Sequence, residues 1–181
     1  MLNPSQEYFH AIIPSIIDII SSRQSPTYTR AAAFAISQML SPDTTLHHKL
    51  TSSIILSFLH QPFCEVTEEH AGPAASSSLS KFTPATALST LVTLVSNTDP
   101  SPILMMALLS PITPALYSLY HHVGGVKTSD PSLKESLRGL LVTWGKIVGQ
   151  SEGLDVFWHI IMNNEGGWQV DLEGHIHKLA R

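Results

Sequence analysis

The chain has 181 residues, of which 43% are hydrophobic and only 13% are charged, and its formal net charge is −4. This length fits one domain that can bury about two thirds of its unfolded surface. The acidic balance and the scattered Lys and Arg residues exclude a nucleic-acid surface, because such surfaces neutralise phosphates with clustered basic side chains. Since the charged share is about half the usual quarter, we expect much of the surface to contact other protein.

Proline residues mark the starts of the predicted helices. A short polar side chain can cap the first turn, and proline at the next position lacks only an N–H that has no helical partner there. Nine of the twelve prolines follow such a residue: Asn3-Pro4, Ser25-Pro26, Ser41-Pro42, Thr83-Pro84, Asp99-Pro100, Ser101-Pro102, Ser110-Pro111, Thr113-Pro114 and Asp130-Pro131. The chain therefore reads as a series of separately capped helices.

Three apolar-periodic segments occupy the first third of the chain. Residues 5–21 predict a helix that Pro14 kinks or restarts, although the run 16–20 is also compatible with a strand. Residues 27–40 predict a second helix, in which Phe34 provides bulk beside small alanines. Ser41-Pro42 predicts the start of a third helix, which ends near Leu59.

Residues 61–81 are polar and interrupted by proline and glycine, so they predict a flexible loop. A loop of this length either carries a binding motif or is disordered. The single cysteine, Cys64, excludes an internal disulfide and fits a reducing compartment. We interpret it as a small apolar filler. A catalytic thiol would need a positioned base, and His60 is the only local candidate for one.

Residues 83–96, 101–109 and 110–122 predict three further helices. No Asp, Glu, Lys or Arg occurs between Asp99 and Lys127, and residues 103–120 are long enough to cross a bilayer. Pro111 and Pro114 each remove a backbone donor from this stretch. Two buried helices separated by a break therefore fit better than a membrane span.

The C-terminal quarter predicts two more helices. Residues 131–149 have clear helical spacing and are capped by Asp130, or alternatively by a capping box of Ser132 and Glu135. Residues 151–162 have four large apolar side chains on one face: Leu154, Phe157, Trp158 and Ile161. Residues 168–181 are short and ambiguous.

The predicted fold class is all-α, an α-solenoid of HEAT/armadillo-like antiparallel helical pairs with about eight helices. The capped starts suggest that the second helix pairs with the third, the fourth with the sixth and the seventh with the eighth. Each pair occupies about forty residues, as in HEAT and armadillo units. Residues 1–181 are expected to form a single helical-repeat domain.

The sequence shows no catalytic, cofactor or metal site. Its ten histidines include two adjacent pairs and one spaced pair, His47 with His48, His121 with His122, and His175 with His177. Adjacent side chains on a helix diverge, and no Cys pair or HExxH motif accompanies them. No phosphate-binding loop, nucleophile elbow or dinucleotide fingerprint occurs, so we expect a non-enzyme without a cofactor.

Two segments of the C-terminal half carry a resemblance to a known family. Residues 101–120 and residues 130–148, which include Leu-Leu-Val-Thr-Trp-Gly at 140–145, are similar to the HEAT-repeat family of transport and Golgi organisation protein 6. Its fungal relative is an RNA polymerase II assembly and nuclear transport factor. The resemblance covers residues 101–174 and involves helix cores and caps, so no binding residue carries over. It implies that this chain is a fragment of a longer cytoplasmic solenoid.

The resemblance implies a non-catalytic scaffold or adaptor that serves RNA polymerase II assembly and nuclear import. Its expected partners are proteins, either polymerase subunits or nuclear transport machinery, and neither nucleic acid nor a membrane. The alternative is a secretory-pathway (Golgi) trafficking factor, peripheral or membrane-associated. We expect a cytoplasmic location, with shuttling to the nucleus left open. The oligomeric state and the helix face that binds also stay open.

Overall fold

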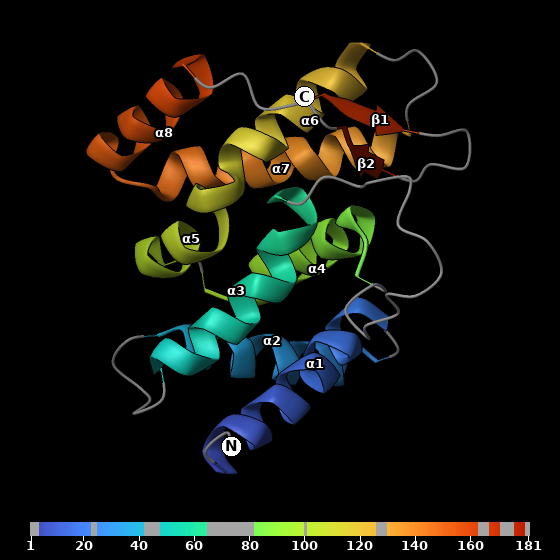
Figure 1. Cartoon of the computed structure of the whole chain (residues 1–181), viewed down its shortest axis with the longest axis vertical. Coiled ribbons are helices and arrows are strands. Elements are labelled where there is room, and N and C mark those ends of the chain that lie inside the picture. Colours follow the sequence, from blue (N-terminus) through green and yellow to red (C-terminus); the bar gives the residue numbers. More distant parts are fainter. Residues whose placement is uncertain are drawn as a thin grey trace.

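A computed structural model describes residues 4–22, 25–41, 48–64, 82–99, 101–125, 130–162, 167–170 and 176–179. These residues form eight α-helices, one short 3-10 helix and one two-stranded sheet. The helices are arranged along the longest axis of the molecule, with α1 near one end and α8 near the other (Figure 1). This arrangement agrees with the predicted all-α solenoid of about eight helices.

The first four helices share one part of the core. They are α1 (Pro4–Ser22), α2 (Pro26–Leu40), α3 (His48–Cys64) and α4 (Pro84–Asn97). Of the predicted kink or restart at Pro14, the restart is wrong, because α1 is continuous through Pro14, and the alternative strand at residues 16–20 is wrong as well. It packs on α2, α3 and α4, and a 3.0 Å hydrogen bond between the Ser21 and Thr90 hydroxyls joins α1 to α4.

Helix α3 differs from its prediction at the C-terminal end. The sequence predicts that this helix ends near Leu59 and that residues 61–81 form a loop. The structure instead continues the helix to Cys64 and includes Pro62. The physical reason is Phe63, which is fully buried and anchors the added turn to the core. Residues 42–47, where the third helix was predicted to start, and residues 65–81 of the predicted loop lie outside the described residues.

The apolar stretch in the middle of the chain is divided as predicted. Helix α5 (Pro102–Leu109) leads into the 3-10 helix η2 (Ser110–Ile112), and α6 (Thr113–Gly125) follows. Pro111 and Pro114 lack the N–H groups that an unbroken α-helix would use here. Two side chains donate to backbone carbonyls beside the break: the His60 Nε2–H to Leu108 and the Thr113 hydroxyl to Leu109, each at 2.8 Å.

Among the described residues, Pro102–Gly125 is the one stretch that is long and apolar enough to cross a membrane. In this fold, 56% of its most apolar window is buried against other parts of the protein. Core helices of soluble proteins meet the same criteria, so the stretch by itself is weak evidence for a span.

The last two helices are α7 (Pro131–Ile147) and α8 (Gln150–Met162). The most extensive helix contacts are between α1 and α2, α3 and α4, and α6 and α7. Helices α2 and α3 also pack together, as predicted, but the predicted pairing of the fourth helix with the sixth and of the seventh with the eighth is wrong. Helix α8 packs mainly on α6 and has weaker contact with α7.

A β-hairpin follows the helices where the sequence was ambiguous. Strand β1 (Trp168–Val170) pairs antiparallel with β2 (Ile176–Lys178), and Trp168 lies opposite Lys178. The hairpin packs on α6 and α4. Buried Trp168 meets Phe63 of α3 edge to face, with 6.5 Å between ring centroids, and Lys178 Nζ donates to the Phe63 carbonyl at 2.9 Å. The hairpin therefore ties the C-terminal segment to the end of α3.

Three predicted caps form in the described residues. The Thr83, Ser101 and Asp130 side chains each accept a hydrogen bond from a backbone N–H of the first turn. Ser132 donates its hydroxyl and its N–H to Asp130, and these two bonds lower the pKa of the Asp130 carboxyl. Ser25 precedes α2 without a side-chain cap bond. The polar residue before proline thus marks the starts of α2, α4, α5 and α7, although it does not always bond there.

Candidate functional site

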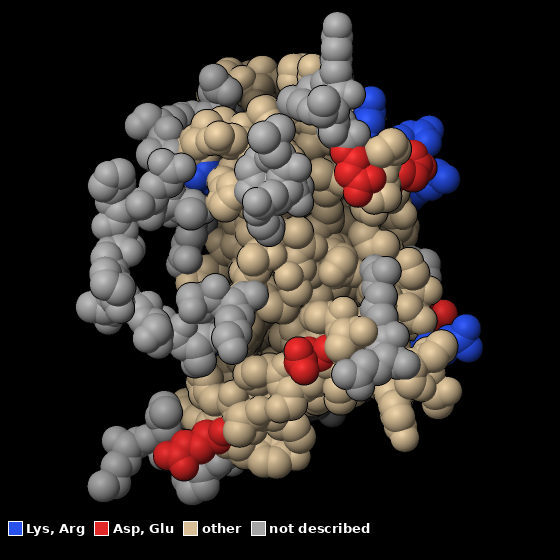
Figure 2. All heavy atoms as spheres, turned by 90° about the vertical axis from the view of Figure 1, so that its right-hand side faces the viewer, with Lys and Arg blue, Asp and Glu red and all other residues tan. Residues whose placement is uncertain are grey.

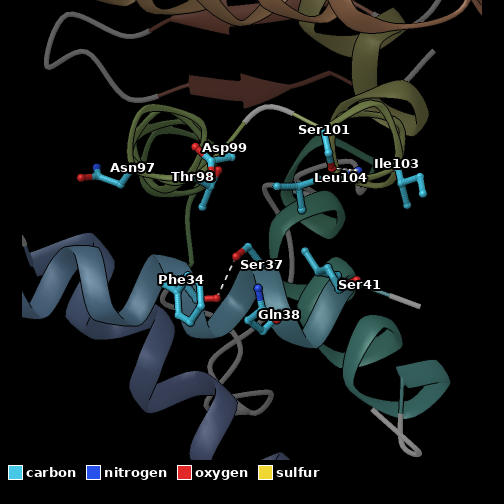
Figure 3. Close-up of a pocket in the computed structure, with 11 residues that line it drawn as sticks. Phe34, Ser37, Gln38, Ser41, Asn97, Thr98, Asp99, Ser101, Ile103 and Leu104 are labelled. Carbon is cyan, nitrogen blue, oxygen red and sulfur yellow. Dashed lines mark hydrogen bonds between the residues drawn. The ribbon is translucent and has the colours of Figure 1, made fainter. Parts of the chain in front are cut away.

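A groove of about 400 Å³ lies between the last turns of α2 and the connection from α4 to α5. Its volume is within the range of ligand pockets. Figure 3 shows the α2 side chains on one side and those of the connection on the other. The lining residues are Phe34, Ser37, Gln38, Leu40 and Ser41 from the α2 side, and Asn97, Thr98, Asp99, Ser101, Ile103 and Leu104 from the α4–α5 side.

Two large apolar side chains give the groove its walls. Phe34 is 63% exposed and Ile103 is 57% exposed. Helix α2 buries Ala33 and Ile36 in the core, and the helical spacing directs Phe34 away from them. Phe34 and Ile103 come from different helices and lie toward opposite ends of the groove (Figure 3). Exposed apolar residues gathered around a hollow are typical of surfaces that bind another molecule.

Apart from Phe34, Ile103, Leu40 and Leu104, the described lining is polar, and most of it is neutral. The Ser37 hydroxyl donates to the Phe34 carbonyl at 2.8 Å, and the Leu104 N–H donates to Ser101 Oγ at 3.2 Å. Asp99 is the one charged residue among the described lining residues, and it is exposed. Among the described residues the only salt bridge joins Arg138 to Glu135, so Asp99 has no ion-pair partner there.

The groups that the lining offers for chemistry are few. Its described residues include no histidine, cysteine or lysine that could act as a base or a nucleophile beside Asp99. Within the described ranges, no group of three or more His, Cys, Asp or Glu side chains could hold a metal ion. The groove offers apolar contact area, neutral hydrogen-bonding groups and one carboxylate.

Neither Cys64 nor His60 lines this groove. Cys64 is exposed at the end of α3. His60 is largely buried, and its Nε2–H donates to the Leu108 carbonyl. Burial lowers the pKa of His60, and the hydrogen bond to Leu108 raises it by less. The prediction that Cys64 is a small apolar filler is wrong, because Cys64 is exposed rather than packed in the core.

The other histidines that the structure describes do not form a cluster that could hold a metal ion. His48 makes a 3.3 Å contact from Nδ1 to the Met39 carbonyl, which joins α3 to the end of α2. His121 is exposed and His122 is half-buried near the end of α6, while His177 lies on β2. His47 and His175 lie outside the described residues.

A second hollow of about 500 Å³ lies between α4 and α7. Its charged residue is Glu135, which already bonds to Arg138 at 3.3 Å. It is lined by Val92, Val95 and Leu140 among small polar residues, and Gly139 forms part of its floor. We prefer the groove beside α2, because its carboxylate has no such pairing and its apolar walls are more exposed.

Helix α8 has an apolar face that the prediction identified but could not orient. Its four predicted residues are all exposed, with Trp158 at 62% and Ile161 at 73%, and no residue of α8 is buried. Phe157 still meets Trp144 of α7, with 5.8 Å between ring centroids. The helix therefore packs through one edge and leaves most of its apolar face uncovered in this chain.

The sequence contained only an indirect signal for the groove. The sequence predicts Asp99 and Ser101 as caps before proline, and Phe34 as a bulky residue of α2. These residues come together only because α2 and α4 end side by side. This is a feature of the tertiary structure. The absence of Lys and Arg from both helix ends was visible in the sequence and could have drawn attention to Asp99.

Comparison with known proteins gives one family. The family model described as "Transport and Golgi organization protein 6 homolog, ARM-like repeat" matches residues 2–178. No curated protein and no solved structure matches the chain significantly.

Proposed function

The chain belongs to the transport and Golgi organization protein 6 family of ARM-like repeat proteins, and from this premise we propose that it is a non-catalytic scaffold that binds partner proteins. The observation that supports this function most is the groove between α2 and α5, where Phe34 and Ile103 are exposed around a hollow without catalytic groups. Helical solenoids bind through such surfaces, since stacked repeats hold them rigidly.

The surface charge is consistent with a protein partner. Figure 2 shows a face on which most side chains are uncharged, while Lys, Arg, Asp and Glu side chains lie mainly toward its edges. Nucleic acid would require clustered basic residues, and the whole chain has ten Lys and Arg against fourteen Asp and Glu. Protein is therefore the favoured class of ligand.

The proposed process is RNA polymerase II assembly and nuclear import. Its support is the resemblance of residues 101–120 and 130–148 to the fungal assembly and transport factor. The proposed partners are polymerase subunits or nuclear transport machinery, in the cytoplasm. An alternative is a trafficking role in the secretory pathway, which the words "transport and Golgi organization" in the family description favour.

Affinity purification of the tagged chain from cells, followed by mass spectrometry, tests the proposal. We expect polymerase II subunits, and we expect the double variant Phe34→Ser/Ile103→Ser to lose them. The matched control is Val142→Ser on α7, which changes a residue that is 44% exposed outside the groove and should keep the partners.

Two results would count against the leading proposal. Recovery of vesicle coat or tether proteins in place of polymerase subunits would favour the trafficking alternative. Equal capture by the wild type and the groove variant would remove the groove from the account. Carbonate extraction checks the membrane version of the alternative, because a spanning protein stays in the pellet.

A further inference from the structure

The groove lies where two long helices end. Helix α2 has 15 residues and ends at Leu40, and α4 has 14 residues and ends at Asn97. The last turns of both helices contribute lining residues (Figure 3). The carboxyl end of a helix carries about half a negative charge from its free carbonyl groups. Two negative ends therefore meet at one hollow.

No cation in these last turns balances them. Neither α2 nor α4 has a basic residue in its last turn. Neutral groups satisfy individual carbonyls instead: the Asn97 amide donates to Thr93 and the Thr98 hydroxyl donates to Leu94, both at 2.8 Å. These bonds satisfy hydrogen-bonding capacity but add no positive charge.

Asp99 adds a full negative charge at the same place. It lies two residues after Asn97, the last residue of α4, is exposed, and is the one charged residue in the described lining. The amino end of α5 has the opposite polarity, but α5 has only eight residues. Its first residue is Pro102, which has no N–H, and Ser101 already accepts the Leu104 N–H. The net field in the groove thus favours a cation.

Resting on the proposed protein-binding function, we infer that the groove takes a Lys or Arg side chain of a partner's peptide segment, with an apolar residue next to it. The cation lies against Asp99 and the ends of α2 and α4. The apolar neighbour covers Phe34 or Ile103, and an arginine can also stack on the Phe34 ring. Anionic lipid headgroups and phosphates are disfavoured, because they would meet the Asp99 carboxylate and the partial negative charges at the ends of α2 and α4.

Selection from a displayed library of random peptides tests this inference on the intact chain. We expect enriched peptides to place Lys or Arg beside an aromatic or aliphatic residue. The best peptide is then synthesised in two forms, one with arginine and one with citrulline, which keeps the shape but removes the charge. Both are measured by fluorescence polarisation against wild type, Asp99→Asn and the control Asp155→Asn, an exposed carboxylate on α8.

We expect Asp99→Asn and the citrulline peptide each to weaken binding by about threefold to tenfold. Combined, they should weaken it little further, because both remove the same interaction. Asp155→Asn should bind like the wild type. Added salt should weaken the binding of the arginine peptide to the wild type, and it should have little effect on the citrulline peptide or on Asp99→Asn.

Three results would overturn the inference: selection of acidic or uncharged peptides, equal loss with Asp99→Asn and Asp155→Asn, or no selected peptide at all. The protein-binding function would survive any of them if the Phe34→Ser/Ile103→Ser variant still loses its cellular partners. If that variant keeps its partners, the proposed function fails as well. The two failures can therefore be told apart.

Discussion

Replacement of His60 tests how the fold accommodates the break between α5 and α6. The His60 Nε2–H donates to the Leu108 carbonyl at 2.8 Å in a largely buried position beside η2. In His60→Leu the carbonyl loses this donor. A buried acceptor left without a partner costs about 1–3 kcal/mol, and the added apolar burial offsets part of that. We expect a loss of about 1–2 kcal/mol in the free energy of unfolding.

Urea denaturation followed by circular dichroism measures this loss near neutral pH. For a domain of this size, each kcal/mol also lowers the midpoint of thermal unfolding by about 2–4 °C. His60→Gln keeps an N–H donor and should lose less than His60→Leu. His121→Gln is the matched control, since His121 is exposed on α6 and its replacement should change stability by less than about 0.5 kcal/mol.

The same variants give a pH signature. Burial lowers the pKa of His60 in the folded state below the ordinary value of 6.5. At pH values between the folded-state pKa and 6.5, the unfolded chain binds more protons than the folded chain. The contribution of His60 to the free energy of unfolding is therefore fully present above pH 6.5 and is lost as the pH falls through the folded-state pKa. The stability difference between wild type and His60→Gln should therefore shrink on acidification. Two results together would refute the reasoning. The wild type and His60→Leu would be equally stable, and the stability difference between the wild type and His60→Gln would not depend on pH.

Three further changes probe the helices and the hairpin. Trp168→Ala should lower the free energy of unfolding by about 3–5 kcal/mol in urea denaturation, because the ring is buried against Phe63. Trp168→Phe should cost much less, because it keeps a ring and removes a buried N–H that has no partner in the described structure. Ser101→Ala should cost about 1 kcal/mol, and Ser25→Ala clearly less, since only Ser101 makes a side-chain cap bond; equal losses in thermal unfolding would contradict this. Gly139→Ala should stabilise by about 0.5–1 kcal/mol, because a Cβ at this position in α7 meets nothing within 4 Å, and a lower unfolding midpoint would count against it.

The helix starts could be predicted because their causes are local. A polar residue before proline fixes the first turn within a few residues, and Pro84, Pro102 and Pro131 begin helices as expected. The break at Pro111 was also predictable, since the missing N–H is a property of the residue itself.

The misses have tertiary causes. The turn containing Pro62 persists because Phe63 reaches the core and Trp168 packs on it from more than a hundred residues away. Likewise, the short strand β1 is held by this contact rather than by its own propensity. The groove follows the same logic, because Phe34 and Asp99 become neighbours of one hollow only after α2 and α4 have packed.

Site-specific photo-crosslinking in cells tests the binding groove most directly. A photoreactive phenylalanine analogue replaces Ile103 in one variant and Val142, an exposed residue on α7, in the other. Our account predicts covalent adducts with polymerase II subunits from position 103 and none from position 142. Adducts from position 142 alone, or equal adducts from both positions, would contradict the claim that this groove is where the protein binds its partners.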